Sequence, residues 1–111
     1  MSEIERPSPN SARATAVYDR EPEELLGAVG RAIERLSNWS VADRDGRGIR
    51  AVRATSLLRF KDDVAIEAEP GDGPGQTRLA LTSASRVGKG DLGQNPRNLR
   101  ELLDALDAEL G

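Results

Sequence analysis

The hydrophobic residues of this chain change their spacing twice, from a helical period to a period of two and back, and this pattern limits the folds that the chain can adopt. Near the start and at the end, apolar residues recur every three or four positions, as on the buried face of an amphipathic helix. Between residues 39 and 81 the period approaches two, which is typical of strands with one buried face. The pattern therefore predicts a sheet that two helices flank in sequence.

The first helix is expected at residues 22–36 and the second at residues 96–110. Pro22 suits the first turn of a helix, and Pro96 follows Asn95, a residue type that commonly caps one. Each segment carries one apolar stripe, so each helix is expected to bury one face. The stripes consist of Leu25, Leu26, Val29, Ile33 and Leu36, and of Leu99, Leu102, Leu103, Leu106 and Leu110.

Turn residues divide the segment between the helices into strands. Residues 45–48, which are Asp-Gly-Arg-Gly, predict a hairpin turn, and Pro70 ends a strand that begins near Phe60. A further strand is expected at residues 77–83. Because the chain has one Trp and one Phe, Trp39 and Phe60 are expected to pack in the core or at its rim.

These elements predict an α+β fold for the 111-residue chain. The expected order is a short strand at residues 16–18, a helix, an antiparallel sheet of about four strands and a C-terminal helix. Both helices are expected to pack on one face of the sheet. Residues 1–15 hold Ser, Pro, Asn and charged residues and are expected to form a flexible N-terminal arm, whereas residues 16–111 form the single domain.

The composition excludes several classes of chemistry. The chain has no Cys and no His, which excludes thiolate catalysis, disulfides, zinc-finger sites and Ser-His triads. A net charge of -3 argues against nonspecific binding to nucleic acid. There is no apolar run of the kind found in a secretory signal or a membrane span, so we expect a cytoplasmic protein that does not bind membranes.

Two segments hold the most distinctive residues. Residues 59–64 read Arg-Phe-Lys-Asp-Asp-Val, and residues 83–95 read Ser-Ala-Ser-Arg-Val-Gly-Lys-Gly-Asp-Leu-Gly-Gln-Asn. Together they resemble the bacterial and plastid family catalogued as domain of unknown function 1499, over roughly residue 9 to the C-terminus. The resemblance rests on Arg59, Phe60, Asp62, Asp63, Val64, Ser83, Ala84, Ser85, Arg86, Gly88, Asp91, Gly93 and Asn95. The chain departs from the usual family residues at Lys89, Pro96 and Asn98, and membership implies no activity.

The segment 83–95 is expected to leave the sheet, form a glycine-rich loop and start the last helix. Backbone N–H groups and the helix dipole at such a place can hold a phosphate or a carboxylate. On this interpretation the ligand-binding residues are Ser83, Ser85, Arg86, Asp91, Asn95 and Arg97. The alternative is that Arg86 pairs with Asp91 or Asp63 and that the motif is purely architectural.

Asp62 and Asp63 are adjacent on a strand, so their side chains are expected to point to opposite faces. We interpret Arg59, Asp62 and Asp63 as members of structural ion pairs, because a buried Asp62 needs a partner such as Arg59, Arg53 or Arg86. The alternative is a small hydrolase or hard-metal enzyme that uses Asp62, Asp63 or Asp91.

The interpretation that we favour is a non-enzymatic binding module, because a small domain without His and Cys has few routes to catalysis. Its expected partner is a small anion or another protein, with the loop at residues 83–95 as the site. We expect no cofactor, no metal ion, no catalytic residue and no nucleic acid, and a monomer or a weak homodimer.

Overall fold

The computed structural model describes residues 3–54, 60–86 and 93–111, which form one antiparallel sheet and two helices. The strands are β1 (Ile4–Ser8), β2 (Ser11–Tyr18), β3 (Trp39–Arg44), β4 (Gly48–Ala54), β5 (Lys61–Pro70) and β6 (Thr77–Ser85). The helices are α1 (Pro22–Arg35) and α2 (Gln94–Leu110). The expected α+β class is confirmed, with six strands in the sheet in place of about four.

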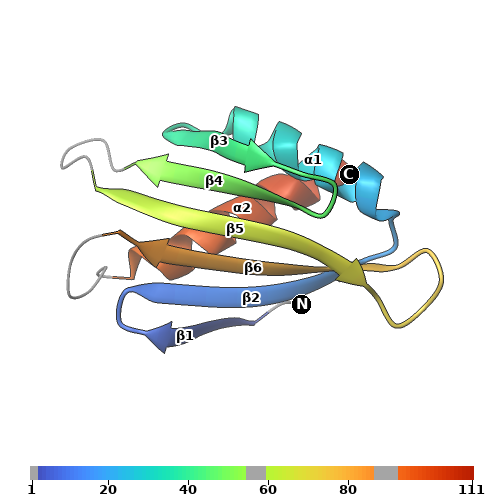
Figure 1. The fold of residues 1–111 in the computed structure, drawn as a ribbon, viewed down its shortest axis with the longest axis horizontal. Helices are drawn as coiled ribbons and strands as arrows, with labels where there is room; N and C mark the ends of the chain where they lie inside the picture. The colour runs from blue at the N-terminus through green and yellow to red at the C-terminus, as the bar shows by residue number, and fades with distance from the viewer. Residues whose placement is uncertain (1–2, 55–59, 87–92) are drawn as a thin grey trace.

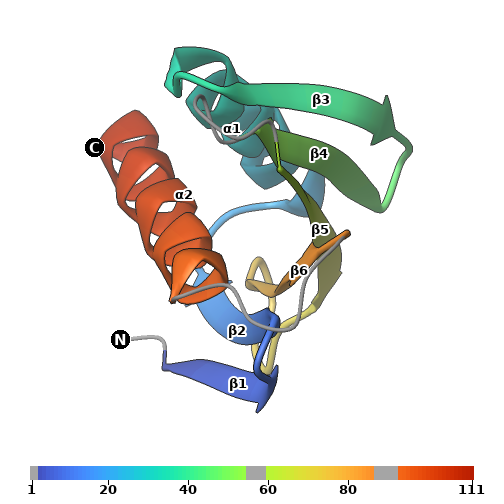
Figure 2. The same cartoon turned by 90° about the vertical axis from the view of Figure 1, so that its left-hand side faces the viewer.

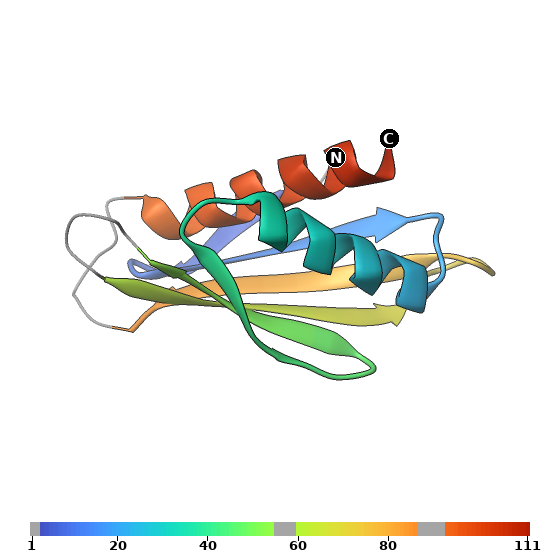
Figure 3. The same ribbon diagram turned by 90° about the horizontal axis from the view of Figure 1, so that it is seen from above.

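The six strands lie in the order β1-β2-β6-β5-β4-β3, so the β1–β2 hairpin forms one edge of the sheet and the β3–β4 hairpin forms the other. All neighbouring strands are antiparallel. Both helices cover the same face of the sheet, as Figure 3 shows. The sheet curves around α2, so its other face is convex (Figure 2).

The core lies between the helices and the inner face of the sheet (Figure 1). Alternation along each strand supplies the sheet side of the core, including Leu79 and Leu81 on β6 and Val64 and Ile66 on β5, all of which are buried. The two predicted stripes supply the helix side, and most of their members are buried. Each fully buried aliphatic side chain contributes about 1.5–3 kcal/mol to the stability of the fold.

Several predicted features are confirmed. The helix at Pro22–Arg35 and the strand that ends at Pro70 lie at the predicted positions. In the β3–β4 turn, the Asp45 carboxylate accepts hydrogen bonds from the backbone N–H groups of Arg47 and Gly48, at 2.7 and 3.0 Å. Trp39 is buried, and its indole N–H donates to the Glu101 carboxylate.

The N-terminal segment departs from expectation, because residues 4–8 and 11–18 belong to the sheet and do not form an arm. β2 pairs with β6 along its whole length and buries Ala12 and Ala14 under the helices. The inward positions of β2 hold alanine, whose small side chain gives a weak alternating signal. That is why the sequence predicted only residues 16–18 of this strand.

Phe60 was expected to pack in or beside the core, but 51% of it is exposed. It precedes the first residue of β5, so the alternation that buries Asp62 and Val64 does not extend to it. Within the described residues, no helix has the length and hydropathy that are needed to cross a bilayer.

Candidate functional site

The inner face of the sheet changes from apolar to polar at the end where β6 leaves it and α2 begins. Along β6, buried Leu79 and Leu81 are followed by buried Ser83, and β5 begins with buried Asp62. The first turns of α2 place Asn95 and Asn98 above them, and both asparagines have no exposed surface. We call Asp62, Ser83, Asn95 and Asn98 the polar cluster.

Hydrogen bonds join the polar cluster across the helix–sheet interface. The Ser83 hydroxyl donates to Asn95 Oδ1 at 2.6 Å and accepts from Asn98 Nδ2 at 3.1 Å. Asn98 Nδ2 also donates to Asp62 Oδ2 at 2.8 Å. A buried amide or hydroxyl without a partner is costly, so this pairing fixes the position of α2 on the sheet.

The remaining atoms of the two asparagines reach neighbouring segments. Asn95 Nδ2 donates to the backbone carbonyl of Asn10 and to the Ser85 hydroxyl, both at 2.8 Å. Asn98 Oδ1 accepts from Gln94 Nε2 at 2.7 Å. The cluster therefore ties together the β1–β2 turn, the end of β6 and the start of α2.

The position of Asn95 corrects its predicted role as a helix cap. The residue before α2 is Gly93, in a left-handed conformation with φ of 81°, and the helix has no side-chain cap. α2 begins at Gln94, so Asn95 lies inside the first turn and its side chain points into the polar cluster. The left-handed conformation suits glycine because a Cβ atom would be strained there.

Of the arginines expected as partners of Asp62, neither Arg53 nor Arg86 pairs with it. Within the described residues its carboxylate bonds only with Asn98, while Arg53 pairs with Glu101 at 3.4 Å and Arg86 pairs with Asp63 at 2.8 Å. Arg59, the third candidate partner, lies outside the described residues. Burial of a carboxylate costs free energy, which a hydrogen bond from a neutral amide offsets only in part.

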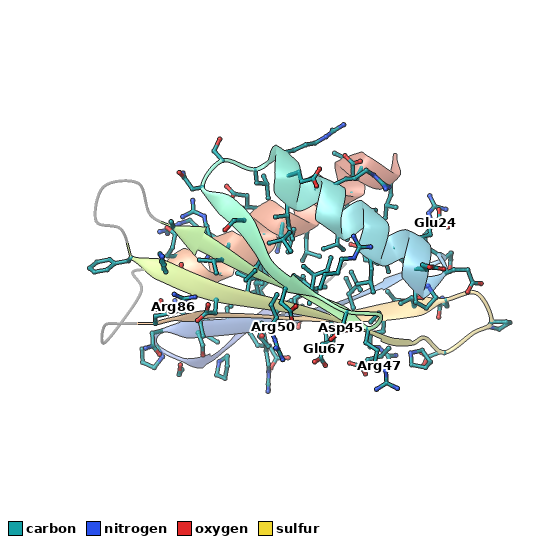
Figure 4. The ribbon with its side chains drawn as sticks, turned by 45° about the horizontal axis from the view of Figure 1, so that its top comes forward. Glu24, Asp45, Arg47, Arg50, Glu67 and Arg86 are labelled. Carbon is teal, nitrogen blue, oxygen red and sulfur yellow. The ribbon has the colours of Figure 1, made fainter. Side chains whose placement is uncertain are left out.

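Asp63 points to the opposite, exposed face of β5 and holds Arg86 there. Arg86 Nε lies 3.1 and 3.0 Å from the two Asp63 oxygens, and this hydrogen bond and the Asp63 charge raise the pKa of Arg86. Figure 4 shows Arg86 at the end of the sheet that lies away from the β3–β4 turn. Both side chains are about half exposed, so solvent screens the pair and it contributes little to stability.

The structure thus brings some predicted site residues together and separates others. Ser83, Ser85 and Asn95 meet through direct hydrogen bonds. Arg86 bonds Asp63 on the outer face, and Arg97 lies exposed on the first turn of α2, where it donates to Gln94 Oε1 at 3.1 Å. Asp91 lies outside the described residues, as does Lys89.

Asn98 was not predicted as a site residue and stood out in the sequence only as a departure from the family pattern. A signal was present, because Asn95, Asn98, Leu99 and Leu102 follow helical spacing and share one face. Polar residues on an otherwise apolar stripe predict a buried polar contact. Their partners, Asp62 and Ser83, could not be deduced without the register of the sheet.

The structure separates the two adjacent carboxylates Asp62 and Asp63. Asp62 is buried under α2 and Asp63 is exposed on the other face, so they do not converge in one cleft. Among residues 3–54, 60–86 and 93–111, no three acidic side chains are arranged to hold a metal ion.

Comparison with known proteins now places the chain in a family. A family model described as "Protein of unknown function (DUF1499)" matches residues 1–106. The chain belongs to DUF1499. No curated protein matches this DUF1499 chain.

Two solved structures resemble the DUF1499 chain in fold. CalU16 from Micromonospora echinospora superposes with a TM-score of 0.58 at 14% identity, covering 100% of this chain and 87% of the other. A protein from Rhodobacter sphaeroides superposes with a TM-score of 0.56 at 16% identity, covering 99% of this chain and 97% of the other. At such low identity the likeness extends to the fold alone.

Proposed function

We propose that this DUF1499 protein is a non-enzymatic binding module that holds a small anion at the first turn of α2. The polar cluster is the support of this site, and Arg97 and Ser85 are its ligand contacts. Ser83 and Asn95 are buried and hydrogen-bonded to each other, so they act by positioning the helix start. Arg86, which is held by Asp63, belongs to the outer face and not to the site.

The observation that carries the proposal is the positive character of the start of α2. The N-terminal end of a helix is electropositive and is usually accompanied by an acidic residue or a side-chain cap. Among the described residues, the first turn of α2 has no acidic residue and no side-chain cap, and it carries the cation Arg97. By contrast, α1 has Glu23 and Glu24 in its first turn. This combination favours a bound phosphate or carboxylate, because such an anion interacts with both the helix end and a guanidinium.

The position of Ser85 adds a hydroxyl to this site. Ser85 is half-buried at the end of β6, and its Oγ accepts from Asn95 Nδ2. Its own hydroxyl proton is therefore available to a ligand oxygen. Catalysis by the serine is not supported, because within the described residues no group that could act as a base contacts it.

The test is a thermal-shift titration with inorganic phosphate on the wild type, Arg97→Gln and Arg47→Gln. Arg47 is a matched control, because it is an exposed arginine in the β3–β4 turn, at the far end of the sheet from Arg86 (Figure 4). Phosphate at about 100 times its Kd stabilises the fold by about 2.7 kcal/mol. We expect phosphate to raise the Tm of the wild type and of Arg47→Gln. We expect no such rise in Arg97→Gln.

Two results would contradict the proposal. The first is the absence of a phosphate-induced shift in the wild type at millimolar concentrations. The second is an equal shift in all three proteins, which would show that phosphate acts elsewhere or through general ionic strength. Sodium chloride at the same ionic strength serves to separate the specific effect from the general one.

A further inference from the structure

A shallow groove runs beside the first half of α2, between this helix and the end of α1. It has a volume of about 540 Å³ and is lined by Leu36, Arg97, Arg100, Glu101, Asp104 and Ala105. Its floor is apolar, since Leu36 and Ala105 are half-buried and pack against the core. Volumes of this size accommodate a small organic ligand.

The charges along the groove are arranged with a definite polarity. Arg97 and Arg100, one helical turn apart, lie at the end nearest the start of α2, whereas Asp104 lies one turn further on. Within the described residues, Arg100 is exposed and makes no hydrogen bond or ion pair. One end of the groove is thus cationic, and the apolar floor continues from it.

The second carboxylate of the groove, Glu101, is already engaged. Its Oε1 accepts from the Trp39 indole N–H and lies 3.4 Å from Arg53 Nε. Arg53 therefore balances the charge of Glu101, and Asp104 is the remaining carboxylate that faces the groove without a cation among the described residues. An anion is favoured at the arginine end and disfavoured at the Asp104 end.

We propose that the groove binds an amphipathic anion, with a phosphate or carboxylate head at Arg97 and Arg100 and an aliphatic tail along Leu36 and Ala105. The inference rests on the proposed function, because the head group occupies the same anion site at the start of α2. It goes further in naming the class of ligand. Arg100 contacts the head, and the apolar floor selects a chain over an inorganic ion, since burial of a few methylene groups raises affinity by about tenfold or more.

The chain provides its own reporter for this experiment. Trp39 is the single Trp, it is 8% exposed, and it donates to Glu101, which lines the groove. Occupation of the groove is expected to change Trp39 fluorescence. The probes are decyl phosphate below its critical micelle concentration, inorganic phosphate with the same head, and decanol with the same tail.

We expect decyl phosphate to bind the wild type at least about tenfold more tightly than inorganic phosphate or decanol does. Leu36→Asp abolishes this gain while the affinity for inorganic phosphate remains. Because Leu36 ends α1 and Leu36→Asp can lower the stability of the fold, Ala105→Gln, which fills the floor with a polar side chain, is measured as well. Arg100→Gln is expected to lower the affinity for decyl phosphate. Asp104→Asn is expected to preserve or raise that affinity.

The outcomes separate this inference from the proposed function. If inorganic phosphate binds in an Arg97-dependent manner but decyl phosphate binds no more tightly, the inference fails and the anion site stands. If the gain survives both Leu36→Asp and Ala105→Gln, the tail does not occupy the groove and the inference fails. Arg47→Gln, with the same change in charge at the β3–β4 turn, must leave decyl phosphate binding unchanged.

Discussion

Ser83 bonds two asparagines at once, so its hydroxyl is the centre of the polar cluster. Ser83→Ala leaves Asn95 Oδ1 without its donor and removes one acceptor from Asn98 Nδ2, inside a site with no exposed surface. We expect a loss of about 1–3 kcal/mol in the free energy of unfolding, measured with urea. The same substitution at exposed Ser40, on the edge strand β3, should change stability by no more than about 0.5 kcal/mol. Equal effects of the two substitutions would mean that the cluster does not hold α2.

The buried carboxylate of Asp62 gives a second prediction at this scale. Asp62→Asn keeps an oxygen that can accept from Asn98 Nδ2 and removes a buried charge, so stability at neutral pH should be unchanged or higher. Asp62→Leu removes the acceptor and should lower stability by about 1–3 kcal/mol. Urea unfolding of both variants provides the comparison. A loss in Asp62→Asn as large as that in Asp62→Leu would show that the charge itself stabilises the fold.

At the scale of elements, the β3–β4 hairpin contains a carboxylate whose ionised form is favoured by folding. Backbone N–H groups of Arg47 and Gly48 donate to Asp45 and hold its pKa below the ordinary value of 3.8. A carboxylate whose pKa falls on folding contributes stability that is present above its unfolded pKa and is lost as pH falls through the folded value. Asp45→Ala should therefore lower Tm at pH 7, and the difference from wild type should shrink below pH 3.8. A difference that stays constant down to pH 2 would contradict this account of the turn.

The second half of α2 is tied to α1 by charge. Arg31 and Arg35 each approach a Glu109 oxygen at 3.0 Å, and the Glu109 side chain is 8% exposed. Glu109→Gln keeps the shape of the side chain but removes the charge, and we expect a loss of about 1 kcal/mol, because the two arginines are largely exposed. The loss should decrease in high salt. Urea unfolding at two salt concentrations measures it, and a loss independent of salt would indicate that packing, not charge, is responsible.

The helices were predictable from the sequence because their stripes contain large residues such as Leu25 and Leu102 at regular spacing. β1 and the first five residues of β2 were not predicted, and on β2 Ala12 and Ala14 mark the buried face only weakly. The location of the site in the sequence was predictable, but its geometry was not. The segment 83–95 was identified, but the inward direction of Asn95 and its contact with the β1–β2 turn depend on the strand order, which places β2 beside β6.

In the whole molecule, the distinctive polar and charged residues of the two sequence segments form an inner set and an outer set. The polar cluster lies inside and joins three segments, while Arg86 on the convex face and Arg97 on α2 lie outside. β6 and α2 lie in different layers (Figures 2 and 3), so Arg86, which follows β6 and pairs with Asp63, belongs to another layer than Arg97 on α2. A ligand at the start of α2 is therefore expected to depend on Arg97 and not on Arg86.

The most direct test of this account is a titration of the 15N-labelled chain with inorganic phosphate, followed in two-dimensional 15N–1H NMR spectra. The account predicts that the amide signals of Ser85, Gln94 and Arg97 move with a common saturation curve, and that those of Arg47 and Gly48 in the far hairpin turn stay in place. Signals that move around Arg86 and Asp63 but not at the start of α2 would contradict it. A spectrum without any saturable change up to millimolar phosphate would contradict it as well.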